Sequence, residues 1–225
     1  LSGFQLSDLS FGMIILDDGT YAVEASGSAA TVNIDNISMT GSLTFRQNTT
    51  DQAFTNESIN VVGQPVNLNF TALETTDFFS FSGDVDLVVA DKVTVDASVA
   101  FKLNNGEVEV VASVTEASLA LGDFKVGLAN ANLALLIKED VAGNQTLALD
   151  ITGSEFILEG ADLTIGTINS VTIQFNNTGD NFDTTSGGTA RDITIDGQPG
   201  TLTTPFGDVT TPYIKVLANM SFNIN

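Results

Sequence analysis

The chain has 225 residues, of which 28 are acidic and 7 basic, giving a net charge of −21, and it contains no cysteine and no histidine. Without these two residue types it cannot form disulfides, Cys/His zinc sites, cysteine nucleophiles or Ser-His-Asp triads. The negative charge excludes nucleic acid and anionic lipid as partners. No apolar run reaches the roughly 18 residues of a membrane span.

Hydrophobic residues alternate with polar ones along most of the chain, which predicts β-strands because successive side chains of a strand point to opposite faces. In the first half this pattern predicts strands at 4–16, 21–25, 31–37, 38–46, 59–62, 66–70 and 78–89. Turn residues separate them, beginning with Asp17-Asp18-Gly19-Thr20. Gly27-Ser28 is expected to end the second strand, and the polar stretches 47–56 and 74–77 are expected to be loops.

The stretch 93–113 is the clearest hairpin. Its first arm alternates apolar residues at odd positions, from Val93 to Leu103, with mostly polar ones between them. Asn105-Gly106 allows the positive φ of a tight turn, and the second arm alternates again from Glu107 onward. The hairpin is therefore expected to have one dry face and one wet, acidic face.

In the second half the same pattern predicts strands at 117–121, 124–137, 145–151, 156–158, 163–168, 171–175, 193–195, 202–206 and 213–217, followed by a terminal strand. For 124–137 a strand with a bulge is favoured over a helix, because Gly127, Asn130 and Asn132 suit a helix poorly. The longest polar segment, 176–190, is expected to be a loop.

Four segments of the first half recur in the same order in the second half. The matched pairs are 4–6 with 124–126, 19–28 with 145–154, 42–48 with 170–176, and 59–65 with 193–199, the last pair sharing Gly-Gln-Pro. Their offset grows from about 120 to about 134 residues, so the second copy has longer loops. We predict a divergent duplication, with module 1 at residues 1–120 and module 2 at residues 121–225, within a longer array.

These observations predict an all-β, antiparallel fold, either an elongated sandwich or a β-solenoid-like array of two divergent repeats, or one continuous β structure. The hairpin 93–113 lies between the two copies and is expected to be the junction at which one sheet continues into the next. Its dry face should then be covered by both copies.

The chain combines Val/Thr/Leu strands with an Asp-Asp-Gly-Thr turn at 17–20, an Asn-Asn-Gly turn at 104–106 and a Phe-Ser-Phe-Ser-Gly segment at 79–83. In these features it resembles the tandem modules of very large secreted bacterial surface proteins, of the adhesin and RTX-like kind. The resemblance implies an extracellular scaffold, adhesin or filament that binds Ca²⁺. The Gly-Gly-x-Gly-x-Asp repeat of a true RTX β-roll is absent from the sequence.

Carboxylate and amide oxygens in loops are the ligands that Ca²⁺ prefers. The first candidates are Asp180, Asn181 and Asp183 in the glycine-rich loop. Two acidic turns at matching repeat positions, Asp17-Asp18 and Glu139-Asp140, are the second. The alternative is that these residues only form turns, whose acidic side chains are solvated and bind no ion. No other cofactor is predicted.

Two pairs of carboxylates, Asp84 with Asp86 and Glu107 with Glu109, lie two residues apart and so share a strand face. Such pairs act as acid and base in glycosidases. No tryptophan platform for a sugar accompanies them, and we predict that the protein is not an enzyme.

The sequence thus predicts a structural repeat of an extracellular or cell-surface bacterial scaffold, filament or adhesin, whose partners are neighbouring copies or adjacent repeats. One alternative is a filament subunit that donates a strand, in which case 1–16 or 213–225 would lack a partner within its own chain. Another is a module that binds polysaccharide or a cell-surface ligand through an aromatic cluster seeded by Tyr21, Tyr213 and Phe182.

Overall fold

The computed structural model describes residues 3–32, 37–61, 64–75, 77–89, 93–104, 106–121, 124–140, 142–159 and 168–220. Within these ranges the structure is all-β and antiparallel, and it contains no α-helix. One turn of 3-10 helix occurs at Thr184–Ser186.

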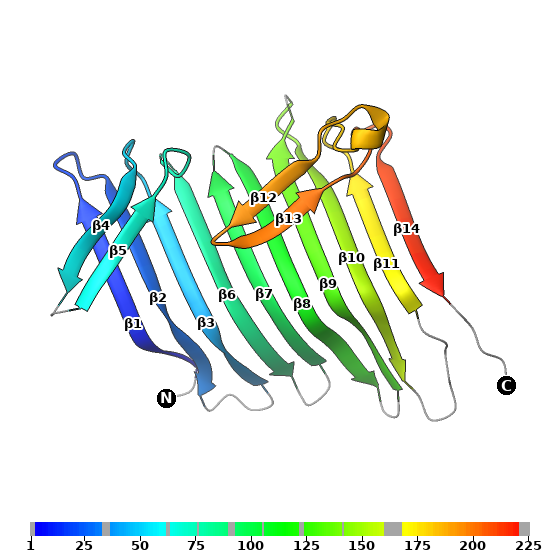
Figure 1. The fold of residues 1–225 in the computed structure, drawn as a ribbon, viewed down its shortest axis with the longest axis horizontal. Helices are drawn as coiled ribbons and strands as arrows, with labels where there is room; N and C mark the ends of the chain where they lie inside the picture. The colour runs from blue at the N-terminus through cyan, green and yellow to red at the C-terminus, as the bar shows by residue number, and fades with distance from the viewer. Residues whose placement is uncertain are drawn as a thin grey trace.

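Ten strands form one open sheet (Figure 1). In their order across the sheet they are β1 (Gly3–Ile15), β2 (Tyr21–Val32), β3 (Ile37–Asn48), β6 (Phe78–Val89), β7 (Val93–Asn104), β8 (Glu107–Leu121), β9 (Phe124–Glu139), β10 (Gln145–Glu159), β11 (Ile168–Asn176) and β14 (Tyr213–Met220). Each strand pairs with the next one along the chain, except where a hairpin is inserted after β3 and after β11. Antiparallel neighbours need only short connections, which fits this simple order.

The two inserted hairpins are β4 (Phe54–Val61) with β5 (Gln64–Phe70), and β12 (Arg191–Ile195) with β13 (Gln198–Leu202). Both cross the same face of the main sheet obliquely (Figure 1). The first contacts β1 and β2, and the second contacts β7, β8, β9 and β10. We call this the hairpin face, which bears Ala22, Ala100 and Leu136. The opposite side, which bears Phe45 and Phe101, is the open face.

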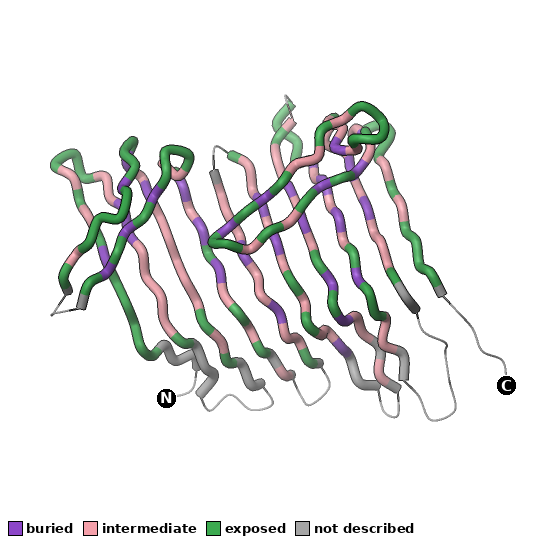
Figure 2. The backbone as a smooth tube through the Cα atoms, in the orientation of Figure 1, coloured by how far each residue is buried: buried purple, intermediate pink, exposed green. Residues whose placement is uncertain are grey.

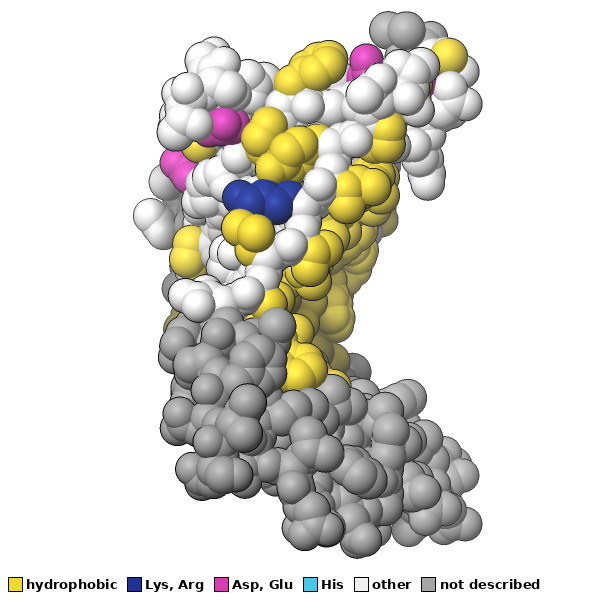
Figure 3. Space-filling view, turned by 90° about the vertical axis from the view of Figure 1, so that its right-hand side faces the viewer, with side chains coloured by type: hydrophobic (Ala, Val, Ile, Leu, Met, Phe, Trp, Pro, Cys, Tyr) yellow, Lys and Arg dark blue, Asp and Glu magenta, His cyan; other side chains and the backbone are white. Residues whose placement is uncertain are grey.

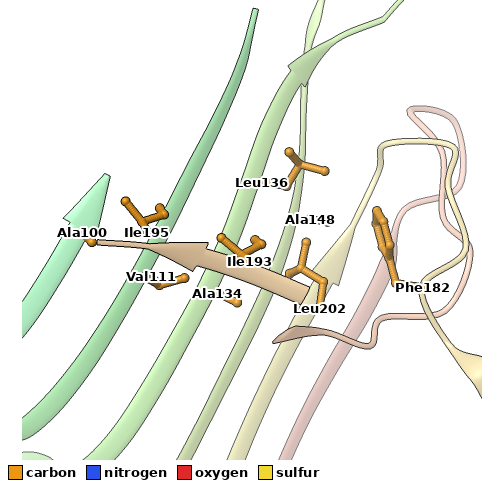
Figure 4. Close-up of a cluster of buried hydrophobic side chains, with 9 residues drawn as sticks. All are labelled: Ala100, Val111, Ala134, Leu136, Ala148, Phe182, Ile193, Ile195 and Leu202. Carbon is orange, nitrogen blue, oxygen red and sulfur yellow. The ribbon is translucent and has the colours of Figure 1, made fainter. Parts of the chain in front are cut away.

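Each hairpin covers a small hydrophobic cluster, and buried residues follow the strands beneath the hairpins (Figure 2). The cluster under β12 and β13 (Figure 4) consists of Ala100, Val111, Ala134, Leu136, Ala148, Phe182, Ile193, Ile195 and Leu202. The cluster under β4 and β5 consists of Ala22, Phe54, Leu68, Phe70 and Phe78. Close approach is required here, because a Cβ on Gly200 would lie 2.6 Å from the Cγ1 atom of Val111.

The two halves of the sheet use matching registers. Ala22 pairs with Asn48 between β2 and β3, and Ala148 pairs with Asn176 between β10 and β11. In both hairpins the second residue of the second strand is a proline. The segments 19–28 and 42–48 therefore pair in the same register as the segments 145–154 and 170–176 that match them in sequence.

Asn48 and Asn176 are fully buried and make the same hydrogen bonds. Each amide nitrogen donates to two main-chain carbonyls in the loops around its hairpin. These are the carbonyls of Gln52 and Glu74 for Asn48, and of Asp180 and Pro205 for Asn176. Each amide oxygen accepts from the main chain and the hydroxyl of the threonine two residues later. The two asparagines thus fix where the chain leaves and re-enters the sheet.

The prediction of an antiparallel all-β fold is confirmed. The stretch 124–137 is a strand, and its irregularity lies at Asn130, which has a φ of 50° and is unpaired with both neighbouring strands. A similar irregularity occurs at Asp8, with a φ of 51°. The predicted boundary at 120/121 falls where β8 ends, and β8 pairs with β9 across it. The division into two modules, and a sandwich or solenoid built from repeats, stay predictions.

Several predicted strand limits are wrong. Gly27-Ser28 does not end the second strand, because β2 continues through it. Gly27 instead lies beside the β1 irregularity, where a Cβ would come within 2.9 Å of the Ser7 carbonyl oxygen. The strand predicted at 202–206 lies earlier, since β13 ends at Leu202.

Other predicted segments merge into longer strands. Residues 117–121 and 156–158 are the ends of β8 and β10. The loop predicted at 47–56 is shortened from both sides by β3 and β4. Residues 33–36 and 163–167, which belonged to predicted strands, lie outside the described residues.

The hairpin of β7 and β8 forms as predicted, but the covered face is not the expected one. Ala100 and Val111 lie on the side predicted to be wet and are buried beneath β12 and β13. Phe101 and Val110, on the predicted dry side, are only half-buried. Periodicity separates the two faces correctly, but it does not reveal which one the inserted hairpins cross.

We predict that Asn48→Ala and Asn176→Ala each lower the free energy of unfolding by about 2–3 kcal/mol, because each removes a fully buried amide that donates to two main-chain carbonyls and accepts from a threonine. Urea unfolding followed by circular dichroism measures this. The matched control is Asn132→Ala on exposed Asn132, which is expected to change stability by less than about 0.5 kcal/mol. An equal loss in all three variants would contradict the assigned role.

Candidate functional site

The open face is lined by apolar side chains from every strand. Directly paired residues of antiparallel neighbours share a face, so the pairing traces rows across the sheet. One row contains Phe11, Ala25, Phe45, Phe81, Phe101, Val110, Leu135, Leu149, Phe175 and Ile214. Parallel rows run from Met13 through Leu103 to Leu147, from Leu43 through Ala112 to Val216, and from Gly41 through Val114 to Ala218. These rows contain no charged residue, and their one polar residue is Gln47.

In the described part of the chain no segment covers this face. Figure 3 views the molecule from the β14 edge, and hydrophobic side chains form a band down the side away from the hairpins. Phe11 is 52% exposed, Phe81 38% and Val216 66%. Most members nearer the middle shield one another from the side and are half-buried, and the small or packed residues Val23, Ala97 and Ala131 are buried. An apolar surface that extends over ten strands is larger than the few hundred Å² usual on a monomer.

The open face has relief near its first strands. Phe79 packs edge-to-face between Phe45 and Phe101, with ring centroids 5.4 and 5.6 Å apart. Beside them is a hollow of about 130 Å³, lined by Leu9, Ala25, Ser26, Gly27, Leu43, Phe45 and Phe81. The surface is therefore able to interlock with protruding apolar side chains.

The hairpin face carries charged residues beside its two hydrophobic clusters, and Arg46 of β3 is its central charge. The guanidinium lies 3.5 Å from Glu24, 2.9 Å from Glu74 and 2.8 Å from Asp196. It also lies 4.8 Å from the ring centroid of Phe70. Asp196 is at the tip of the second hairpin, whereas Glu74 follows the first. Arg46 therefore joins the two hairpin-bearing halves.

Arg191 of β12 fixes the second hairpin to β8. Its Nη2 atom lies 2.5 Å from Oε1 of Glu109 and 2.6 Å from Oε2 of Glu107. Lys102 pairs with the other oxygen of Glu109. Burial by itself raises the pKa of Glu109, but hydrogen bonds and charge from Lys102 and Arg191 outweigh it and hold this pKa below its usual range.

A polar cleft of about 340 Å³ lies beside the second hairpin, over β9, β10, β11 and β14. Its acidic residue is Asp150, which is 6% exposed. Asp150 accepts hydrogen bonds from Nε2 of Gln174 at 2.6 Å and from the main-chain nitrogen of Thr203 at 2.5 Å. Both carboxylate oxygens are thus engaged: Oδ1 accepts from Gln174 of β11, and Oδ2 attaches the chain after β13 to the sheet.

The edge strands β1 and β14 each have one strand partner in the described sheet. Leu9 and Ile15 of β1 are each 63% exposed, and Ile214 of β14 is 66% exposed. Natural edges are usually protected by charged residues or proline. Here each edge strand has a single charged residue, Asp8 or Lys215, and no proline. Both edges are therefore open to pairing with another strand.

The acidic turns proposed for calcium lie at the ends of β1 and β9. Asp18 accepts hydrogen bonds from the hydroxyl and the main-chain nitrogen of Thr20, which lower its pKa. Asp140 accepts from the side chain and main-chain nitrogen of Asn144, which lower its pKa in the same way. Asp17 and Glu139 are exposed beside them.

The glycine-rich loop engages its candidate ligands internally. Asp180 lies 2.5 Å from Nζ of Lys138, and Asp183 accepts from the main-chain nitrogen of Thr185 at the start of the 3-10 turn. Asn181 accepts from the main-chain nitrogen of Asp183. No group of three acidic side chains suited to a metal ion occurs among the residues described. Calcium binding by these loops stays a prediction.

The remaining sequence candidates are separated. Asp84 accepts from the hydroxyl of Ser98 on the neighbouring strand, and Glu107 and Glu109 share Arg191. Phe182 is buried at 5% exposure in the second cluster, far along the chain from Tyr21, whose hydroxyl donates to Gln47. These aromatic residues do not form the exposed cluster that sugar binding would need.

Sequence reasoning missed Arg46, Asp150 and Arg191. The internal repeat held a signal for the first two. Glu24 pairs with Arg46 across β2 and β3, and Asp150 pairs with Gln174 at the matching place across β10 and β11. Polar pairs at the same place in both halves indicate a point at which the segments around an inserted hairpin attach to the sheet.

No protein-family model, curated protein or solved structure matches this chain. No helix long and apolar enough to cross a membrane occurs among the residues that the structure describes.

We predict that Arg191→Met lowers the free energy of unfolding by about 2 kcal/mol, because it leaves buried Glu109 with one of its two cations. Thermal and urea unfolding measure the loss. The control is Lys125→Met, which removes the more exposed pair with Glu116 and is expected to cost less than about 0.5 kcal/mol. Equal losses would show that Arg191 does not hold the hairpin.

Stability should fall in acid because of Glu109. Its pKa is lower in the folded than in the unfolded state, so its stabilisation is complete above the unfolded value and is lost as pH falls through the folded value. Between about pH 5 and pH 3 the melting temperature of Glu109→Gln should therefore fall less than that of the unmodified protein. Glu24 has the opposite sign, since burial raises its pKa. Glu24→Gln should steepen the acid loss.

Proposed function

We propose that this chain is a structural, non-catalytic module of an extracellular scaffold, filament or adhesin, and that it assembles with copies or adjacent modules through β-sheet contacts. The observation that carries the proposal is the pair of open edge strands, β1 and β14. Each presents exposed apolar side chains and a single charge. A second strand can add to such an edge by continuing the main-chain hydrogen bonds.

On this proposal the two halves of the chain are themselves an example of one module's sheet continuing into another. The matching registers and the matching bonds of Asn48 and Asn176 support a duplication. Between the two copies, β7 and β8 continue the ladder without interruption. Edge-to-edge addition of further modules repeats this arrangement.

The distribution of charge supports a long, soluble assembly. Strand carboxylates such as Glu24, Asp84 and Glu109 lie on the hairpin face. A net charge of −21 keeps assemblies from associating through these acidic surfaces. With no cysteine in the chain, the assembly needs no disulfide and depends on sheet contacts.

Two alternatives have less support. Strand donation needs a terminal segment without a partner, but β1 pairs with β2 and β14 pairs with β11. Glycan binding needs clustered exposed aromatic residues, and Phe182 is buried. Neither is proposed.

We predict that the purified protein forms ribbons longer than one copy, visible by negative-stain microscopy. The double variant Ser10→Lys/Leu217→Lys places a lysine on each edge strand, at exposed sites on the hairpin face. It should shorten the ribbons to one or two copies, because charged edge residues oppose strand addition.

The matched control is Ser42→Lys/Ser113→Lys, which adds the same charge to inner strands at exposed sites on the same face. It should leave ribbon length unchanged. An unmodified protein that forms no ribbons, or ribbons that survive both edge lysines, would contradict edge-to-edge assembly.

A further inference from the structure

We propose that the open face is a self-complementary interface on which a second copy of this sheet packs, face to face. The inference deepens the proposed function, since it adds a second contact to the same structural module. Edge addition lengthens the sheet, whereas face packing doubles its thickness.

The first support is the size of the surface. From the usual spacings of strands and residues, the four apolar rows cover about 45 Å by about 20 Å. Two such faces in contact bury about 1,800 Å² in total, which is the size of a standard stable protein interface. A face of this extent is sufficient for a specific pair.

The second support is the separation of charge across the sheet. The four rows contain no charged residue, while carboxylates such as Glu24, Asp84 and Glu109 point to the hairpin face. Two copies with a net charge of −21 each can therefore meet without bringing like charges into the interface. Face-to-face packing keeps the acidic surfaces outermost, on both sides of the pair.

The third support is the shape of the face. Two sheets pack about 10 Å apart when their side chains interdigitate. The hollow beside Gly27 can receive side chains, and the ridge of Phe45, Phe79 and Phe101 can insert into such a hollow. The recess and the projection therefore lie on one surface. A two-fold axis presents the same patch from each copy, so one chain suffices to build the interface.

A lipid surface is the competing occupant, and the composition disfavours it. The chain has no tryptophan, the residue that commonly anchors proteins at the edge of a bilayer. Its seven basic residues are too few to balance its 28 acidic ones, and the resulting negative charge repels anionic headgroups. A second copy has neither disadvantage.

The experiment uses the full chain carrying the two edge lysines, Ser10→Lys/Leu217→Lys, so that face contacts alone remain. Light scattering coupled to gel filtration should give about twice the 23.5 kDa of one chain. Adding Ala112→Lys, in the centre of the open face, should give a monomer. Adding Ser113→Lys instead, one residue away on the hairpin face, should leave the pair intact. The monomer should stay folded by circular dichroism, since the new lysine then points into water.

A second measurement holds even if the Ala112→Lys variant does not fold. The chain has no cysteine, so Ala112→Cys or Ser113→Cys introduces a single thiol. A maleimide should modify Cys at 113 quickly at all protein concentrations. At 112 it should react at least ten-fold more slowly in concentrated than in dilute protein.

The outcomes separate the two proposals. If the unmodified protein forms dimers but no ribbons, face packing is supported and edge assembly is contradicted. Ribbons one sheet thick, with equal thiol reactivity at both sites, retain edge assembly and overturn face packing. Face packing is also overturned, in favour of a lipid surface, if the edge-lysine variant is a monomer that floats with neutral phosphatidylcholine vesicles and if Ala112→Lys abolishes this flotation.

Discussion

The rest of this structure depends on the attachment of both inserted hairpins to one face of the sheet, through two buried hydrophobic clusters and the ion pairs of two arginines. Arg46 binds Glu24, Glu74 and Asp196, and Arg191 binds Glu107 and Glu109. These contacts hold both hairpins over the polar side of the sheet, where small alanines leave room for them. Since the hairpins are the only second layer in the described structure, the apolar side remains uncovered. The exposed face is thus the one that neither inserted hairpin crosses.

The two halves reach the same arrangement with different chemistry. In the first half Arg46 and Glu24 form an ion pair between β2 and β3. In the second half Gln174 and Asp150 form a hydrogen bond at the matching place between β10 and β11, and we call each such pair an anchor. The asparagine beside each anchor is retained with all its hydrogen bonds. A buried carbonyl without a donor is costly whatever its neighbours are, whereas an anchor can use an ion pair or an amide. The asparagine is therefore the less replaceable part of the design.

The sheet separates two kinds of surface that assembly requires. Carboxylates and hairpins occupy one side and make it soluble, while the other side and both edges can associate. Under the two assembly proposals, a protein with this distribution grows in one direction through its edges and doubles in thickness through its face. Its acidic surfaces then remain outermost and limit further association.

The sequence by itself determined that the chain forms strands and where most of them lie, though not their limits, because the alternation of apolar and polar residues directly reflects the pleat of a strand. It also determined the antiparallel all-β class, the hairpin of β7 and β8, and the matching segments of the two halves. It did not determine that Gly27 lies inside a strand, because the reason is an irregularity in the neighbouring strand. Above all, it did not determine which face is covered. That was decided by contacts between residues as far apart in the chain as Arg46 and Asp196, and only the tertiary structure brings these together.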